Sequence, residues 1–263
     1  MSYGHFYPWQ LLTKNAGVFL MQRFEQTFDV ARLQSELAEV LEHHEVIPHY
    51  RPYLATGWGA VTLVGPNGDP TDHRSIQVAK VGNTEYQKTP AMRYTPYIEE
   101  IVSQFPGGRC RVRLMQLQAG RRINWHHDGN LFGLDHQLAR FHIPIVTNPD
   151  VHWQICHEDC HWEEGRLYFL DNSFPHRLTN GGREDRIHLV FDIEVSPELL
   201  QWFPQEMLDQ APQRRELRDK CARWVDQTLG HVYKFQKRLL MKRQKLSSCL
   251  AQRSLKPLRS NQV

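Results

Sequence analysis

The region from residue 110 to residue 194 constrains the fold most, because short strand-like segments follow one another there with no helix between them. Turn sequences such as Asn180-Gly181-Gly182 separate these segments. The predicted strands are residues 111–118, 141–146, 153–156, 166–170 and 186–193. Parallel strands need long crossover connections, which are usually helical, so this spacing predicts an antiparallel barrel or sandwich.

Helical patterns lie on both sides of this β region. Apolar residues recur at helical spacing in residues 27–44, and residues 95–105 predict a second helix. Helical character returns after the β region, with interruptions predicted at three positions: Pro204, Pro212 and Gly230. We therefore expect a mainly β domain with N-terminal helices over residues 1–196 and a basic helical extension over residues 197–263.

The composition fits a folded domain and excludes several other classes of protein. With 263 residues, of which 40% are hydrophobic, the chain can bury a sizeable core, so collagen-like, disordered and coiled-coil proteins are excluded. It has no apolar run of about 18 residues and no N-terminal signal-peptide pattern. Five scattered cysteines favour a reducing compartment, and a cytoplasmic location is expected.

Histidine is concentrated in the β region, where nine of the fifteen histidines lie between positions 126 and 188. His126 and Asp128 are two residues apart, so both side chains project from one face of an extended backbone. His176 follows a predicted strand, and Arg186 begins the last predicted strand. A His-x-Asp pair alone arises easily by chance in a histidine-rich chain, whereas this ordered set is more specific.

These residues have the chemistry of a non-haem iron site. His126, Asp128 and His176 supply the two imidazoles and one carboxylate of a facial triad, which holds Fe(II) and leaves positions open for a chelating 2-oxo acid and O₂. Arg186 suits the far carboxylate of such a co-substrate, because a guanidinium can hold a carboxylate through two hydrogen bonds and stays charged when partly buried.

Residues 118–192 resemble the aspartyl/asparaginyl β-hydroxylase family of Fe(II)/2-oxoglutarate-dependent dioxygenases. The resemblance rests on these motifs: Gly120…Trp125-His126, Arg140-Phe141-His142, Trp162-Glu163-Glu164-Gly165, Asp171-Asn172-Ser173-Phe174-Pro175-His176 and Arg186…Asp192. It implies a double-stranded β-helix (jelly-roll or cupin-like) core, with His126 and His176 on iron and Arg186 on the tail carboxylate of 2-oxoglutarate. Arg140 and His142 match a family pair that engages a carboxylate of the co-substrate or the substrate.

Asp128 departs from part of that family. Family enzymes that act on epidermal-growth-factor-like domains have a glycine where this chain has Asp128. The complete triad is similar to that of bacterial relatives that hydroxylate free amino acids such as proline. A carboxylate at this position also argues against halogenation, because a halide would take the space that a glycine or alanine leaves.

The resemblance leads to a functional hypothesis. The chain is expected to use Fe(II), 2-oxoglutarate and O₂ to hydroxylate an unactivated C–H bond of an amino acid, whether free, in a peptide or on a carrier, with release of succinate and CO₂. Two alternatives stay open, namely a hydroxylase of a lipid or glycolipid at a membrane surface and a non-catalytic β-barrel binding module. The sequence does not separate hydroxylation from desaturation or epoxidation, and it leaves the oligomeric state open.

The end of the chain is basic, since nine Lys or Arg residues and no acidic residue follow Asp226. Its apolar residues fall near one helical stripe: Val232, Phe235, Leu239, Leu246 and Leu250. A helix packed on the domain with a solvated basic face is the favoured interpretation. The alternative is contact between residues 230–263 and an anionic partner, such as a membrane surface or a phosphorylated carrier. No nucleic-acid partner is expected, because no nucleic-acid-binding motif accompanies the tail.

Residues 156–161 place Cys156 and Cys160 beside His157 and His161. A hairpin turn is favoured over a zinc site here, because no second Cys/His pair follows at zinc-finger spacing. His127 lies between two candidate ligands and should point away from the metal. His188 is expected either to line the pocket or to lie in the core.

Overall fold

The computed structural model describes residues 7–48, 55–72, 74, 85–129 and 131–254; beyond residue 236 it describes the side chains of Arg238 and Leu239 only. Its helices are α1 Pro8–Ala16, α2 Val30–His43, α3 Pro96–Ser103, α4 Pro197–Leu200, α5 Gln205–Asp209 and α6 Ala211–Ser254, with a 3₁₀ helix η2 at Pro90–Tyr94. Its strands are β1 Met21–Thr27, β2 Ile47–Pro48, β3 Trp58–Pro66, β4 Tyr86–Lys88, β5 Arg109–Leu117, β6 Arg122–His126, β7 Leu138–Val146, β8 Val151–Ile155, β9 Glu158–Cys160, β10 Arg166–Leu170, β11 His176–Asn180 and β12 Arg186–Glu194.

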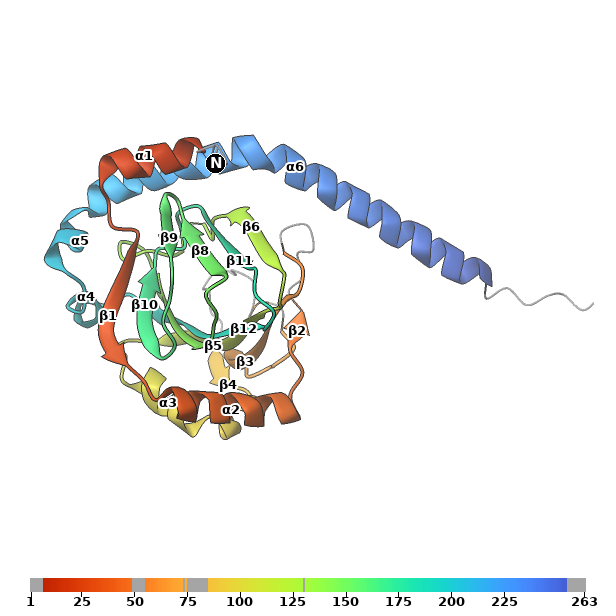
Figure 1. Ribbon diagram of the computed structural model, residues 1–263, viewed down its shortest axis with the longest axis horizontal. Coiled ribbons are helices and arrows are strands. Elements are labelled where there is room, and N and C mark those ends of the chain that lie inside the picture. Colours follow the sequence, from red (N-terminus) through yellow and green to blue (C-terminus); the bar gives the residue numbers. More distant parts are fainter. Residues whose placement is uncertain (1–6, 49–54, 73, 75–84, 130, 255–263) are drawn as a thin grey trace, which may run out of the picture.

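Two antiparallel sheets form the core of the molecule (Figure 1). The larger sheet has the order β1-β10-β7-β12-β5-β3-β2, with β4 paired to β3, and the smaller has the order β6-β11-β8-β9. From β5 to β12 the chain passes back and forth between the two sheets, and only the β8–β9 hairpin stays in one. This alternation is the topology of a double-stranded β-helix, so the predicted fold class is confirmed.

The five predicted strands are present as β5, β7, β8, β10 and β12. The sequence prediction missed β1, β4, β6, β9 and β11, which are short and carry many polar residues. In β11, buried and partly exposed residues alternate over only five positions, which is too short a pattern to stand out. The predicted hairpin after β8 is confirmed, since β9 pairs with β8 in antiparallel fashion.

The helix predictions need three corrections. The first predicted helix begins at Val30 and not at residue 27, because Asp29 caps it by accepting a hydrogen bond from the Arg32 N–H and Thr27 ends β1. Helix α6 runs through Pro212 and Gly230 without a break, although the chain does change direction before α5 at Pro204, as predicted. Pro212 lies in the first turn, where its missing N–H has no intrahelical acceptor. A glycine in the middle of a helix lowers helix stability by only about 1 kcal/mol relative to alanine, so Gly230 need not break α6.

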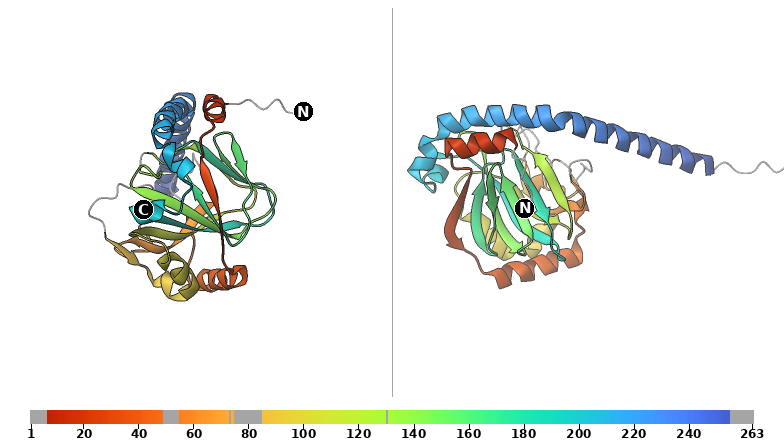
Figure 2. Two further views of the ribbon diagram at one scale, coloured as in Figure 1. Left: turned by 90° about the vertical axis from the view of Figure 1, so that its left-hand side faces the viewer. Right: turned by 45° about the horizontal axis from the view of Figure 1, so that its top comes forward.

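Helices cover the barrel on two sides. Helices α2 and α3 pack on the outer face of the larger sheet, with Leu33 and Ile101 in one apolar cluster with Phe141. Helix α1 and the first part of α6 lie side by side over the other end of the barrel, where Trp9 and Cys221 join a second cluster (Figure 2). The remainder of α6 extends beyond the barrel.

None of the helices in the described part of the chain is both long and apolar enough to cross a membrane. The four cysteines whose side chains are described are free thiols, and all four are buried: Cys110, Cys156, Cys160 and Cys221. The apolar clusters therefore hold the described fold together without a disulfide.

Phe141 occupies the centre of the first cluster, so its truncation tests the packing directly. The ring is fully buried and lies 5.1 Å from the ring of Phe105 and 5.5 Å from that of Phe191, measured between centroids. We expect Phe141→Ala to lower the free energy of unfolding by about 3–5 kcal/mol in urea denaturation. Leu11→Ala, at a half-exposed helix position, should change it by less than about 0.5 kcal/mol. A loss below about 1 kcal/mol for Phe141→Ala would contradict this packing.

Candidate active site

Strand pairing brings the two predicted histidine ligands together. His126 is the last residue of β6, His176 is the first residue of β11, and the two lie directly opposite each other in the antiparallel pair. Their ring centroids are 4.2 Å apart. Residues separated by fifty positions in the chain therefore become neighbours through the register of the smaller sheet.

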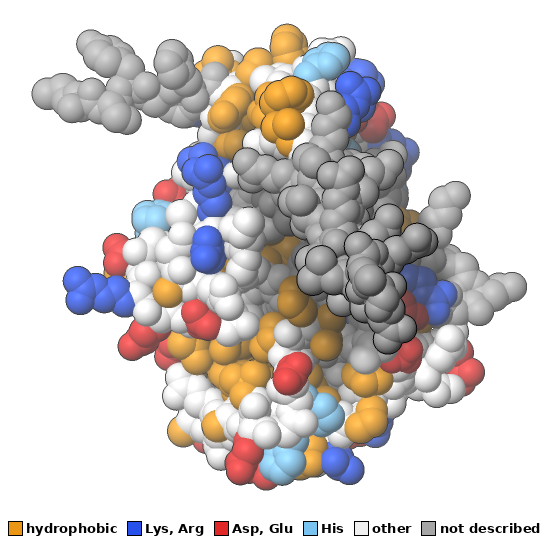
Figure 3. All heavy atoms as spheres, turned by 90° about the vertical axis from the view of Figure 1, so that its right-hand side faces the viewer, with side chains coloured by type: hydrophobic (Ala, Val, Ile, Leu, Met, Phe, Trp, Pro, Cys, Tyr) orange, Lys and Arg blue, Asp and Glu red, His pale blue; other side chains and the backbone are white. Residues whose placement is uncertain are grey.

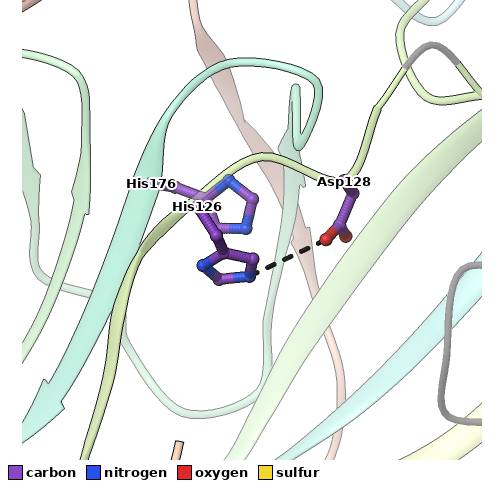
Figure 4. Close-up of side chains that lie close together, drawn as sticks. All are labelled: His126, Asp128 and His176. Carbon is purple, nitrogen blue, oxygen red and sulfur yellow. Dashed lines mark ion pairs between the residues drawn. The ribbon is translucent and has the colours of Figure 1, made fainter. Parts of the chain in front are cut away.

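Asp128 completes the cluster from the loop after β6 (Figure 4). Its backbone N–H donates a 2.8 Å hydrogen bond to the carbonyl of Asn172, in the segment that leads to His176. One carboxylate oxygen of Asp128 lies 3.7 Å from Nε2 of His126, and one donor atom from each of the three side chains lies within 4.8 Å of the others. The three predicted ligands therefore converge on one point.

The backbone orients both imidazoles. Nδ1 of His126 lies 2.8 Å from the carbonyl oxygen of Asn124, and Nδ1 of His176 lies 2.8 Å from that of Phe174. A carbonyl oxygen only accepts hydrogen bonds, so each Nδ1 carries the hydrogen and each Nε2 keeps its lone pair for a metal. In His176 that Nε2 lies 3.3 Å from the side-chain nitrogen of Asn172.

Charge states in the cluster suit a metal. Burial, together with the proximity of His126, lowers the pKa of His176 to about 3, so this imidazole is neutral at neutral pH. For Asp128, burial alone would raise the pKa, but Arg140 and the two histidines outweigh it and lower the pKa to about 2. An ionised carboxylate and two imidazoles whose Nε2 atoms carry a lone pair form the donor set of a facial triad.

Arg140 lies at the site, but protein carboxylates engage it in this structure. Its guanidinium donates to Asp128 at 2.5 Å and to Asp192 at 2.7 Å. Asp192 also forms ion pairs with Arg111 at 2.8 Å and with Arg113 at 2.9 Å. The resemblance had suggested that Arg140 engages a carboxylate of the co-substrate or the substrate. In this structure its guanidinium instead links two protein carboxylates, those of Asp128 and Asp192.

Sequence reasoning missed the ion-pair role of Asp192 and its partners on β5. Asp192 in β12 lies directly opposite Arg111 in β5 and directly opposite Arg140 in β7. Burial alone would raise its pKa, but the three arginines hold the pKa well below its usual range. The available signal was the alternation of arginines with apolar residues at the start of β5, where Arg111 and Arg113 fall within a predicted strand, since buried arginines need anionic partners.

Arg186 has a different environment. It begins β12, only 1% of its surface is exposed, and its guanidinium contacts His188 and lies over the ring of Trp153. Among the described residues no carboxylate pairs with it, and its Nε has no hydrogen-bond partner. Burial therefore lowers the pKa of Arg186 well below its usual value. A buried guanidinium without an anion leaves a strong site for a ligand carboxylate.

His142 lies beside Arg186 on the adjacent strand and also has unused hydrogen-bonding capacity. Its ring is buried against Trp153, and neither ring nitrogen has a hydrogen-bond partner among the described residues. Burial and the nearby Arg186 lower its pKa well below the usual value, so the ring is neutral and can donate one hydrogen bond.

All six predicted site residues line one cavity between the two sheets, with an empty volume of about 410 Å³. The lining residues are Trp58, Met115, Ile123, His126, Asp128, Arg140, His142, Trp153, Asn172, His176, Leu178, Arg186 and Val190. His127 points elsewhere, as expected, since its Nε2 lies 3.8 Å from Asp226 on α6. His188 is buried behind the cavity, where it contacts Arg186.

Helix α6 fixes the segment that precedes His176. Arg214 forms an ion pair with the buried Asp171, and Nε of Arg218 donates to Oγ of Ser173 at 2.6 Å. Asp171 in turn accepts a hydrogen bond from the Ser173 hydroxyl. The first part of α6 therefore supports the loop that positions His176 and, through the Asn172 carbonyl, Asp128.

A family model described as aspartyl/asparaginyl beta-hydroxylase matches residues 27–195. The chain belongs to this family. The match extends from the last residue of β1 to the end of β12, and it confirms the predicted family and the prediction of a hydroxylase. Within this match lie all six residues that the sequence assigned to the site.

Similar proteins include an L-proline cis-4-hydroxylase of Rhizobium meliloti (strain 1021), which is 27% identical over 213 residues, covering 79% of this chain and 72% of the relative. Among solved structures, a prolyl-4-hydroxylase of Pseudomonas putida aligns at a TM-score of 0.40 with 12% identity, covering 72% of this chain and 99% of that one. The structure of HygX of Streptomyces hygroscopicus, with nickel and 2-oxoglutarate bound, aligns at a TM-score of 0.42 with 11% identity, covering 72% of this chain and 87% of that one.

The lowered pKa of His176 makes the stability of the metal-free protein depend on pH. In the unfolded chain this histidine takes up a proton near pH 6.5, whereas in the folded chain it does so only near pH 3. Acid therefore favours unfolding, and the free energy of unfolding should fall as the pH drops through this window. Urea denaturation in the presence of a chelator, at a series of pH values, should show a shallower fall for His176→Ala. Equal slopes for the two proteins would contradict the burial of a neutral His176.

Proposed function

We propose that the chain is an Fe(II)/2-oxoglutarate-dependent dioxygenase that hydroxylates an unactivated C–H bond of an amino acid. The observation that carries the proposal is the pairing, within one cavity, of a facial-triad donor set with a buried arginine that has no anionic partner among the described residues. A metal alone would not require that arginine, whereas a dicarboxylate co-substrate needs both.

The residues present fit both groups. His126, Asp128 and His176 would hold the iron, and Arg186 would hold the far carboxylate of 2-oxoglutarate, with a hydrogen bond from His142. When bound, iron and 2-oxoglutarate supply the oxidising chemistry, in which O₂ gives one oxygen atom to the substrate and one to succinate as CO₂ leaves.

The chain itself contributes orientation, charge and the exclusion of water. Arg140 holds the carboxylate of Asp128 in place and keeps it ionised. The rings of Trp58 and Trp153 and the side chains of Ile123 and Val190 give the cavity apolar walls. Such walls limit the access of water, which strengthens the electrostatic interactions inside and protects reactive species from side reactions.

The cavity favours a small anionic substrate. Its empty volume of about 410 Å³, which includes space open to solvent, has to accept the co-substrate as well. The described residues that line it include two arginines, Arg140 and Arg186, but one carboxylate, Asp128. An amino-acid carboxylate would balance part of this excess positive charge. The similarity to an L-proline cis-4-hydroxylase makes free proline the first substrate to test.

Variants of a metal ligand and of the carboxylate-binding arginine distinguish the roles of these two parts of the site. With Fe(II), 2-oxoglutarate and proline, the wild type should release succinate, and His176→Ala should neither bind iron tightly nor turn over. Arg186→Met should still bind iron but raise the KM for 2-oxoglutarate about 10- to 100-fold, because it removes a charge-assisted hydrogen bond of about 1.5–3 kcal/mol.

His127→Ala is the matched control, since this neighbour of His126 faces α6, and it should retain activity. Peptidyl or carrier-bound proline would replace the free amino acid as substrate if only those forms stimulated succinate release. Unchanged turnover in His176→Ala would contradict the proposed site.

We also propose that the end of α6 contacts an anionic surface. Its described apolar side chains Val232, Phe235 and Leu239 are 45–61% exposed, beside the exposed Lys234 and Arg238. Figure 3 shows hydrophobic and basic side chains side by side at the top of the molecule, where α1 and α6 lie. An exposed apolar stripe flanked by basic residues is typical of helices that lie on anionic membranes, and it supports the lipid hydroxylase as a second candidate.

Sedimentation with vesicles tests this contact. The protein should pellet with phosphatidylglycerol vesicles at low salt and not with phosphatidylcholine vesicles, and Lys234→Glu/Arg238→Glu should weaken the binding several-fold. Arg32→Glu/Arg93→Glu makes the same change of charge on exposed residues around α2 and η2, and it should bind like the wild type. Protein that stays in the supernatant with both lipids would exclude the membrane contact.

A further inference from the structure

The β8–β9 hairpin carries a second group of metal-ligating side chains on its outer surface. His152 of β8, Asp159 of β9 and His161, which directly follows β9, are all exposed, and one donor atom from each lies within 4.8 Å of the others. Nδ1 of His152 is 3.2 Å from a carboxylate oxygen of Asp159, and the two histidine rings lie 5.0 Å apart with an interplanar angle of 72°. The hypothesis of hydroxylation does not use any of these residues.

Strand register produces this group. Trp153 pairs with Cys160 and Gln154 with Asp159, so His152 and His161 are adjacent at the end of the same hairpin. Trp153 and Cys160 point inwards and are buried, which turns His152, Asp159 and His161 outwards together. The gathering of these side chains is therefore a consequence of the backbone and does not depend on a flexible loop.

The donor set and its spacing match a divalent transition metal. Two imidazole nitrogens and one carboxylate oxygen suit zinc, which takes such ligands at about 2.0–2.2 Å in tetrahedral geometry with water in a free position. At those bond lengths two ligand atoms are roughly 3.3 Å apart, close to the observed separation of His152 and Asp159. The third ligand needs only a small side-chain movement, because every donor is already within 4.8 Å.

The sequence had raised a zinc site in this hairpin as an alternative, with His161 in common but with Cys156, His157 and Cys160 as the other ligands. Cys156 and Cys160 are both buried, and burial raises the pKa of Cys160 to about 12, so neither thiol faces the outer surface of the hairpin. The structure brings in His152 from the paired strand instead. The pairing of β8 with β9, which no spacing rule along the chain reveals, supplies this ligand.

We propose that His152, Asp159 and His161 form a second, structural metal site of the zinc class, separate from the triad in the barrel. A metal here links β8 to β9, a strand of three residues at the edge of the smaller sheet. It thereby stabilises the strand from which Trp153 reaches the cavity wall and which pairs with β11, the strand of His176. The ion has no contact with the reacting groups and acts through the hairpin.

Zinc binding in a background without the triad tests the proposal. Chelator-treated His176→Ala should bind one Zn²⁺ per chain in competition with a chromophoric chelator, and zinc should raise its Tm. Adding His161→Ala or His152→Ala should raise the dissociation constant at least tenfold and abolish the shift in Tm. Adding His43→Ala, which removes a histidine from the last turn of α2, should leave both unchanged.

The number of zinc ions bound by the wild type and by His161→Ala is a second, independent test of the site. The wild type should bind two zinc ions per chain and His161→Ala one, with the same far-ultraviolet circular dichroism. If His176→Ala binds no zinc under these conditions, or if adding His161→Ala leaves its zinc affinity unchanged, the proposal of a second metal site is wrong. Because these readouts need neither 2-oxoglutarate nor turnover, they are independent of the proposed catalytic activity.

Discussion

Asp192 stabilises the centre of this barrel by neutralising buried positive charge. It forms ion pairs with Arg111, Arg113 and Arg140 from the two strands that flank its own. Moving an ion out of water costs several kcal/mol, so three guanidiniums can be buried side by side only where a carboxylate and further partners compensate them. Arg140 then extends the network to Asp128, and the position of a candidate iron ligand comes to depend on the packing of the larger sheet.

The two sheets contribute different parts of the site. The smaller sheet supplies His126 and His176 through one antiparallel pair, while the larger sheet supplies Arg140, His142 and Arg186. The cavity exists because these two sheets face each other, and most of its polar groups sit on strands, whereas Asp128 and Asn172 lie on loops. The arginines of α6 fix the loop before His176 from outside.

Local sequence signals predicted part of this arrangement. Apolar runs marked five strands, and the residue types His126, Asp128, His176 and Arg186 predicted a triad with a carboxylate-binding cation, because that chemistry needs those types in that order. The division at residue 196 stays a prediction. Strands β6 and β11 were not predicted, because their many polar residues obscure the alternation of buried and exposed positions. The helix breaks predicted at Pro212 and Gly230 were wrong, because position in the helix and tertiary contacts outweigh intrinsic helix propensity. The ion pairs of Asp192 and the outer cluster around His152 depend on strand register, which single-sequence patterns do not encode.

Arg186, which has no anionic partner among the described residues, and the triad together form the proposed site for a metal and a dicarboxylate. A crystal structure of the protein grown anaerobically with Mn²⁺ and 2-oxoglutarate tests it most directly. We predict that the metal binds His126, Asp128 and His176, and that the far carboxylate of 2-oxoglutarate lies within hydrogen-bond distance of the Arg186 guanidinium. A metal bound elsewhere, or a 2-oxoglutarate that leaves Arg186 without an anionic partner, would contradict it.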